Sequence, residues 1–128
     1  MSMIAGTIIY VVDDKTYFLV ADESADSSFF AVKMHRHDTD TALGSILHGL
    51  KADLGIDPNN LRLGELAAWH TKRGDTAEDL ISLYTFTVVD PSLLNHQRIE
   101  MAGMHFKWAE GLVDLLKHVD VSGVTQLD

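Results

Sequence analysis

Residues 34–56 constrain this chain more than any other stretch, because they predict one long amphipathic helix over about 39–54. Oxygen-bearing side chains at Asp38, Thr39 and Asp40 are suited to accept the first free N–H groups of the helix. Gly55 would end it, since glycine readily turns the chain left-handed after a helix. The apolar residues recur at the spacing of one buried helix face, and they are Ala42, Leu43, Ile46, Leu47, Leu50 and Leu54.

The rest of the chain reads mainly as strands, which are rich in β-branched and aromatic residues. We expect them at residues 4–12, 17–21, 29–32, 61–70, 80–89 and 105–108. Turns are expected at 13–15, 57–60 and 71–79, and residues 92–104 have no clear pattern. A second amphipathic helix is expected near the end, where Trp108, Leu112, Leu115, Leu116 and Val119 repeat at helical spacing. This order predicts an α/β (α+β) domain with a mixed sheet between helices.

Composition narrows the class of protein. The formal net charge of −9 disfavours nonspecific nucleic-acid binding, which needs clustered Lys and Arg. A small phosphorylated ligand is still compatible with this charge, because a metal ion can bridge two negative partners. The sequence has no long apolar run, no signal-peptide pattern and no cysteine, so we expect no membrane span, no disulfide and a cytoplasmic protein.

The predicted helix and its flanks resemble the Nudix box, G-x5-E-x7-R-E-U-x-E-E-x-G-U, where U is a bulky aliphatic residue. In this register Leu50, Gly55 and Ile56 keep the structural positions. The chemical positions are replaced: Met34 stands at the first glycine, Asp40 at the first glutamate, His48 at the arginine, Gly49 at the next glutamate, and Ala52 and Asp53 at the paired glutamates.

The order of elements around the box also resembles the Nudix fold, from about residue 4 to residue 117. An opening AGTII strand, a later LYTFTVV strand and a closing FKWAEGLVDLL segment stand where that family has its first strand, a core strand and its last helix. The resemblance implies a single Nudix-like domain over 1–128, with a mixed β-sheet sandwiched between α-helices and a tail from about residue 120.

The resemblance also implies hydrolysis of a nucleoside diphosphate linked to another group, with Mg²⁺ or Mn²⁺ as cofactor. Glutamates at i, i+3 and i+4 of one helix project to one side and can hold hard cations. Such cations activate a bound water. Of these three positions only Asp53 carries a carboxylate. The resemblance implies that the box arginine orients a box glutamate, so a histidine at position 48 agrees with the absence of that glutamate. We therefore expect the hydrolysis that the box supports to be weak or absent. Alternatively, this is an ordinary amphipathic helix in which Gly49 and Ala52 are small because another element packs closely against them.

Other residues could restore a site. Asp40 and Asp53 are the candidate metal ligands, and Asp53 and Glu100 are the candidate catalytic carboxylates. The HRHDTD segment at 35–40 could bind a metal, although a solvated loop that caps the helix is the simpler interpretation. Lys72 and Arg73 could meet a phosphate or form a solvated turn. The aromatic residues Tyr84, Phe86, Trp69 and Trp108 are expected in the core.

Two functions of different classes remain open. One is a Nudix-type hydrolase with residual activity, and the other is a non-catalytic Nudix-like module that binds a nucleotide-type ligand or a protein partner. In the second case no cofactor is required. Neither function requires nucleic acid or a membrane, and a homodimer that uses the exposed side of residues 80–89 is possible.

Overall fold

The structure, a computed structural model, describes residues 2–23, 26–34, 41–72 and 78–121. The strands are β1 (Ser2–Val12), β2 (Lys15–Glu23), β3 (Asp26–Ser28), β4 (Phe30–Met34), β5 (Leu61–Lys72), β6 (Glu78–Val88), β7 (Met104–Trp108) and β8 (Val119–Val121). The helices are α1 (Ala42–Leu54), α2 (His96–Met101) and α3 (Val113–Leu116), with 3₁₀ turns η1 (Pro58–Asn60), η2 (Pro91–Leu93) and η3 (Ala109–Leu112). None of the described helices is long and apolar enough to cross a membrane.

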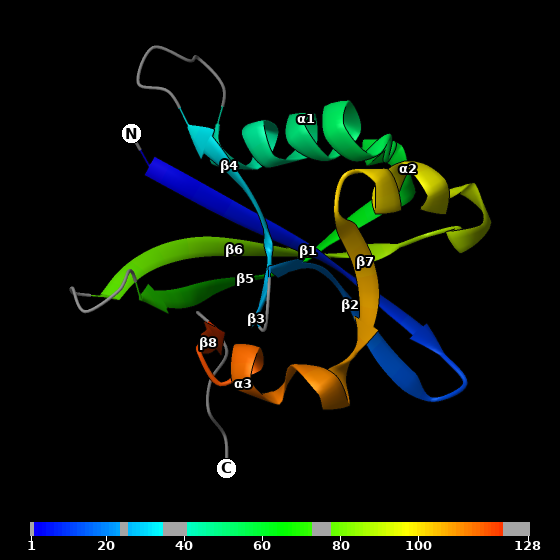
Figure 1. The fold of residues 1–128 in the computed structure, drawn as a ribbon. Helices are drawn as coiled ribbons and strands as arrows, with labels where there is room; N and C mark the ends of the chain where they lie inside the picture. Colours follow the sequence, from blue (N-terminus) through cyan, green and yellow to red (C-terminus); the bar gives the residue numbers. More distant parts are fainter. Residues whose placement is uncertain (1, 24–25, 35–40, 73–77, 122–128) are drawn as a thin grey trace.

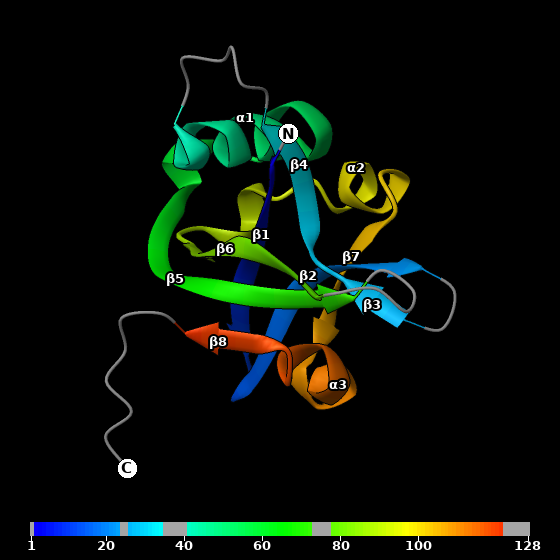
Figure 2. The same cartoon turned by 90° about the vertical axis from the view of Figure 1, so that its left-hand side faces the viewer.

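The strands form one mixed eight-stranded sheet between two helical layers, which confirms the predicted α/β architecture. Figure 1 shows α1 and α2 on one side of the sheet and α3 on the other, and the perpendicular view in Figure 2 shows the same separation. The two sides are called the α1 face and the α3 face below.

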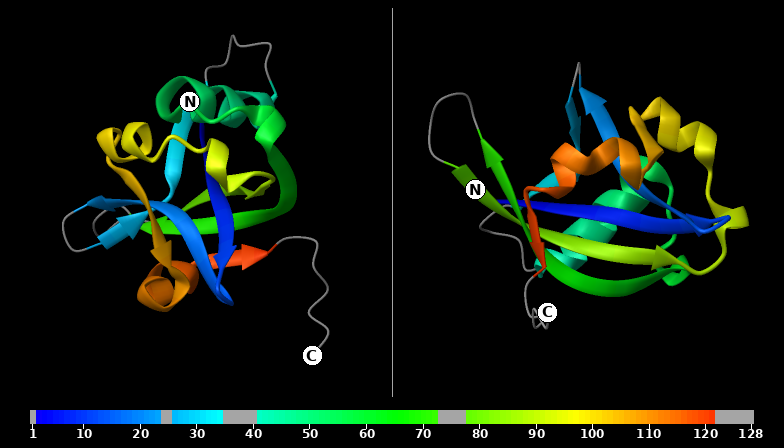
Figure 3. Two further views of the ribbon diagram at one scale, coloured as in Figure 1. Left: turned by 90° about the vertical axis from the view of Figure 1, so that its right-hand side faces the viewer. Right: turned by 90° about the horizontal axis from the view of Figure 1, so that it is seen from below.

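The central strand β1 organises this sheet. It pairs in parallel with β6 along one edge. Along its other edge it pairs first with β4 and then with β2, both antiparallel, so the sheet forks along β1. The path continues from β2 to β3 and from β6 through β5 to β8, while β7 pairs with β2. The views in Figure 3 show how this fork lets the strands curve around β1. From Ser82 to Thr87 β6 is paired along both edges, with β1 on one side and β5 on the other.

The β1–β2 hairpin closes at the predicted turn. Asp13 and Asp14 both have positive φ, at 51° and 64°, and the flanking Val12 pairs with Lys15. Two consecutive residues with positive φ are typical of a type I′ turn, whose twist matches that of the strands on either side. Aspartate tolerates this left-handed backbone better than most residues with a side chain do.

Helix α1 confirms the amphipathic pattern, but its N-cap lies one residue beyond the predicted caps. The Oγ1 of Thr41 accepts a hydrogen bond of 3.0 Å from the backbone N–H of Gly44. Asp38, Thr39 and Asp40 lie outside the described residues. The C-terminus is as predicted: Gly55 has φ of 68°, and its N–H donates to the carbonyl of Lys51 at 3.0 Å.

The two faces of the sheet carry separate apolar cores. On the α1 face the fully buried Ile46, Leu50 and Leu54 pack with Ile8 of β1 and Phe86 of β6. Burying each such side chain contributes about 1.5–3 kcal/mol. The smaller core on the α3 face includes Phe29, Trp69, Leu83 and Leu112.

The core assignments of aromatic residues are confirmed with one exception. Phe86 and Trp69 are buried, and Tyr84 packs against the α1-face core. Trp108 is 41% exposed, so its assignment to the core was wrong. It ends β7, and the ammonium of Lys15 lies 4.7 Å from the centroid of its ring, in a cation–π contact at the surface.

The predicted C-terminal helix is shorter than its pattern indicated. Residues 109–112 form η3, and α3 has a single turn. Val119, which continued the helical spacing, begins β8 and pairs with Trp69 of β5. Strand pairing with β5 therefore replaces the last helical turn and includes Val121, which was assigned to the tail. Residues 122–128 lie outside the described residues.

Candidate functional site

Gly49 stands where the box motif has the glutamate that follows its arginine, and this position lies in the core. Gly49 is buried on the side of α1 that faces β4. A Cβ on Gly49 would lie 2.7 Å from Cγ1 of Val32 and 3.3 Å from Cε2 of Phe30. The first distance is shorter than carbon atoms normally approach. The close approach of β4 therefore favours glycine here, as the packing interpretation of the small residues predicted.

Ala52 and Asp53 stand at the paired glutamates of the motif, and both lie at the surface, unlike Gly49. Ala52 and Asp53 are exposed in the last turn of α1, so close packing does not explain the small side chain of Ala52. The backbone carbonyl of Ala52 accepts a hydrogen bond of 2.6 Å from Nη2 of Arg98 on α2. The same arginine lies against Gly55, where a Cβ would be 2.9 Å from its Cδ. Arg98 therefore joins α2 to the C-terminal end of α1 and satisfies one of its free carbonyls.

The predicted carboxylates do not gather into a cluster in the part of the chain that the structure describes. Asp53 is exposed on α1, Glu100 is exposed on α2, and Asp40 lies outside the described residues with the rest of the 35–40 segment. Among the described residues, no three His, Asp or Glu side chains are close enough to hold a metal ion together. Lys72 ends β5, and Arg73 lies outside the described residues.

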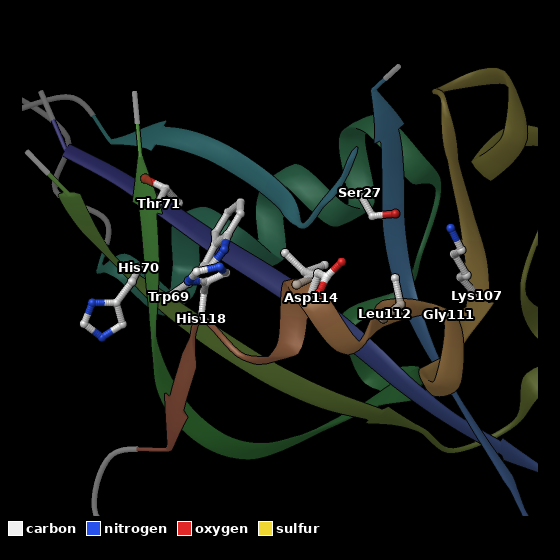
Figure 4. Close-up of a pocket in the computed structure, with 10 residues that line it drawn as sticks. Ser27, Trp69, His70, Thr71, Lys107, Gly111, Leu112, Asp114 and His118 are labelled. Atoms are coloured by element: carbon white, nitrogen blue, oxygen red, sulfur yellow. The ribbon is translucent and has the colours of Figure 1, made fainter. Parts of the chain in front are cut away.

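An open cleft of about 460 Å³ lies on the α3 face, and we call it the polar cleft. It is lined by Ser27, Trp69, His70, Thr71, Lys107, Gly111, Leu112, Asp114, Leu115 and His118. Figure 4 shows Trp69 and Lys107 at opposite ends of this cleft, with Asp114 and Ser27 between them. An aromatic wall, a cation, a carboxylate and a hydroxyl thus come from β5, β7, α3 and β3.

Neighbouring contacts fix the wall formed by β5. The ring of Trp69 packs edge-on against Phe29, with ring centroids 5.0 Å apart. His70 points to the opposite side of β5 (Figure 4), and its Nε2 lies 2.9 Å from Oδ2 of Asp120 on β8. The stem of Lys107 lies along Gly111, where a Cβ would be 3.2 Å from its Cε. The aromatic wall is therefore held by the α3-face core and by the pairing of β5 with β8.

Sequence reasoning missed this cleft. Trp69 was assigned to the core, which is correct but incomplete, because a residue 9% exposed can also line a cleft. Lys107 and Asp114 were not singled out. In the sequence, these two residues are marked only as polar positions among the apolar residues of β7 and α3. Such a pattern does not show which elements lie side by side in the fold.

The comparisons with known proteins agree with this architecture. No family model matches the sequence, and no curated protein matches it. Solved structures do match. An Ap4A hydrolase from C. elegans is 10% identical, with a TM-score of 0.63 over 91% of this chain and 86% of that chain. The NUDIX domain of NrtR from Shewanella oneidensis, in complex with ADP ribose, is 10% identical, with a TM-score of 0.57 over 90% of this chain and 77% of that chain.

The chain has the Nudix fold. A further structure, a binary complex of the C. elegans Ap4A hydrolase, supports the same conclusion at 14% identity, with a TM-score of 0.60 over 91% of this chain and 84% of that chain. At these identities the likeness establishes the fold, which confirms the resemblance inferred from the box register and the order of elements. Helix α1 contains the residues that the register above places in the helical part of the box, and it is called the box helix below.

Proposed function

We propose that this Nudix-fold protein binds a nucleotide-type ligand in the polar cleft and leaves its diphosphate intact. One observation carries the proposal: the box glutamate position at Gly49 is filled by core packing, while an open polar volume lies on the other face of the sheet. The chemistry expected of the box and the volume able to hold a ligand are thus on opposite faces.

The placement of the carboxylates that were expected to bind a metal ion argues against hydrolysis by the box mechanism. Mg²⁺ takes six oxygen ligands in near-ideal octahedral geometry, and in phosphate sites it usually keeps several waters and is held by one or two carboxylates together with the phosphates of the ligand. The predicted holders are Asp40, Asp53 and Glu100. The two that the structure describes are exposed on different helices, and no third acidic or histidine side chain joins them among the described residues. The described residues do not fit a bound Mg²⁺ or Mn²⁺, so we derive no catalytic step through a metal.

The polar cleft has the groups that a nucleotide needs. The ammonium of Lys107 suits a phosphate oxygen, because a charged donor forms a strong hydrogen bond with an anion. Trp69 gives an aromatic wall against which a base can pack, and Asp114 can accept hydrogen bonds from ribose hydroxyls or a base amino group. The described volume of about 460 Å³ is within the usual range of small-molecule sites, about 300–1,000 Å³. The fold neighbour in complex with ADP ribose supports this ligand class.

A second candidate function is a weak hydrolase, and the likeness to an Ap4A hydrolase favours it. In that case Asp53, Glu100 and Asp40 would have to act together, with residues 35–40 brought beside α1 and α2. The two candidates make different predictions for the same ligand, which is either bound and recovered intact or cleaved.

The test combines binding and turnover. The protein is mixed with ADP-ribose, Ap4A, nucleoside triphosphates and nucleotide sugars, each with Mg²⁺, with Mn²⁺ and with a chelator. We expect saturable binding of at least one ligand and no cleavage. Binding should weaken in Lys107→Gln and persist in Lys51→Gln, a matched change on the exposed face of α1. Metal-dependent cleavage that is lost in Asp53→Ala would contradict the proposal.

A further inference from the structure

A second cavity, of about 490 Å³, lies on the α3 face beside the polar cleft, and we call it the apolar cavity. Its floor is the sheet itself, with Ile9 of β1, Phe18 of β2 and Leu83 of β6. Leu116 of α3 and Val119 of β8 line it from the helical layer. These side chains come from five elements, so the cavity is a feature of the assembled fold.

The cavity stays open because the helical layer on this face is short. Helix α3 has only four residues and β8 three, and the adjacent Leu115 and Leu116 line different spaces. Leu115 lines the polar cleft, whereas Leu116 lines the apolar cavity. One turn of helix therefore separates two binding volumes of different chemistry and does not fill either.

A β-bulge forms the outer end of the cavity. The pairing of β5 with β6 shifts by one residue between Leu63 and Leu66. The hydroxyl of Thr85 fills the bulge: it accepts from the N–H of Glu65 and donates to the carbonyl of Glu65, both at 2.8 Å. Gly64 must lack a side chain here, because a Cβ would lie 2.9 Å from Oγ1 of Thr85.

Two of the hydroxyls in the lining, those of Thr7 and Thr85, already have partners. The buried hydroxyl of Thr7 donates to the carbonyl of Leu19 at 3.0 Å, and that of Thr85 is bound within the bulge. A polar ligand group placed here would lose its hydration with little in return, at a cost of about 1–3 kcal/mol. Glu65 is the charged residue of the lining, and an anionic ligand would lose its hydration against the apolar walls without a cation to pair with in that lining.

We propose that the apolar cavity binds the hydrocarbon part of a small uncharged ligand. The cavity has the size of ordinary small-molecule sites, about 300–1,000 Å³. Its apolar walls supply the driving force, since removing hydrocarbon surface from water is favourable by about 25 cal/mol per Å². This site is separate from the polar cleft, and the inference does not depend on the proposed nucleotide function.

The experiment titrates n-decanol, below its aggregation concentration, into protein with ¹³C-labelled methyl groups and follows the methyl spectrum. We expect saturable shifts at Ile9, Leu83, Leu116 and Val119. Decanoate should bind more weakly than decanol because its charge would lose hydration against apolar walls that offer no cation. Equal binding of the two would overturn the uncharged class, and the absence of saturable shifts at these methyls would overturn the site.

Cavity-filling variants provide the control. Ile9→Trp places an indole in the cavity and should weaken decanol binding about tenfold or more, a loss of about 1.4 kcal/mol. Val12→Trp adds the same ring on the other face of β1, where the side chain is 37% exposed, and should leave binding unchanged. If Ile9→Trp does not fold, Leu116→Trp fills the cavity from the helical side. Unchanged decanol affinity in a folded cavity-filled variant would overturn the proposal.

Discussion

The two faces of the sheet use their side chains for different purposes. On the α1 face, the box helix is packed against β1, β4 and β6 by fully buried residues such as Leu50. On the α3 face, a four-residue helix and a three-residue strand cover the sheet, and both described cavities lie there. The α1 face therefore includes Gly49, which the box register places at a glutamate and which the structure places in the core.

This difference separates the structural role of a motif from its chemical role. Leu50 and Gly55 keep the functions that fold the box helix, because one is buried in the core and the other forms the left-handed C-cap. Gly49, which the register places at a glutamate, packs closely against Val32. The helix thus stabilises the fold through its buried face, and the proposed ligand site lies on the other face.

The strongest test of the comparison restores a box glutamate on the α1 face. Gly49→Glu should lower the free energy of unfolding by at least about 3 kcal/mol, since its Cβ would overlap Val32 and its charge would be buried without a partner. Ala52→Glu, at the exposed paired position, should change stability by about 0.5 kcal/mol or less. Denaturant unfolding measures both. Equal stability of the two variants would mean that the α1 face is open after all.

A pair of leucine truncations compares the packing of the two faces. Leu50→Ala should cost about 2–5 kcal/mol, because Leu50 is fully buried on the α1 face. Leu115→Ala should cost less, about 1–2 kcal/mol, because Leu115 is only half-buried beside the polar cleft. Thermal and denaturant unfolding of both variants give the two values. The reverse order would break the comparison.

The cation of the polar cleft should matter for binding rather than for stability. Lys107→Gln should weaken nucleotide binding about tenfold, since a hydrogen bond to a charged group contributes about 1.5–3 kcal/mol. Lys51→Gln on the α1 face serves as the control and should bind as the unmodified protein does. Titration calorimetry measures both affinities. If both lysines have the same effect, the attraction is a property of overall charge and not of the cleft.

The N-cap of α1 predicts a smaller effect. Thr41→Ala removes the acceptor for the N–H of Gly44 and should cost about 1 kcal/mol in unfolding free energy. Thr41→Ser keeps the hydroxyl and should be nearly neutral. If the alanine variant is as stable as the serine variant, the helix is capped by another residue.

The smallest expected effect concerns the pair between His70 and Asp120. The aspartate side chain is 77% exposed, and such surface pairs contribute about 0.2–1 kcal/mol. Asp120→Asn should therefore lower stability by well under 1 kcal/mol, and high salt should reduce the difference further. A loss of several kcal/mol would show that β8 is a major support of the α3 face.

Sequence reasoning predicted what local pattern determines. The buried face of α1, the cap at Gly55 and the turn at Asp13 and Asp14 follow from spacing and from backbone preference. The helix expected to run to Val119 failed, because the edge of β5 was available for pairing and tertiary context overrode local periodicity.

The candidate site was harder to predict because its residues are distant in sequence. The polar cleft joins Ser27, Trp69, Lys107 and Asp114, which are brought together only when β3, β5, β7 and α3 assemble. Likewise, the burial of Gly49 depends on where β4 crosses the helix. The roles proposed for Asp53 and Glu100 stay predictions, and Asp40 lies outside the described residues.

The most direct test of the central claim is one NMR sample that contains ¹⁵N-labelled protein, ADP-ribose and Mg²⁺. Amide shifts report where the ligand binds, and ³¹P signals report whether the diphosphate survives. We predict saturable shifts at Trp69, Thr71 and His118 around the polar cleft, with the diphosphate ³¹P signals retained and no phosphomonoester signal appearing over days. Cleavage of the diphosphate, or shifts centred on Asp53 and Glu100 with none in the cleft, would contradict the account.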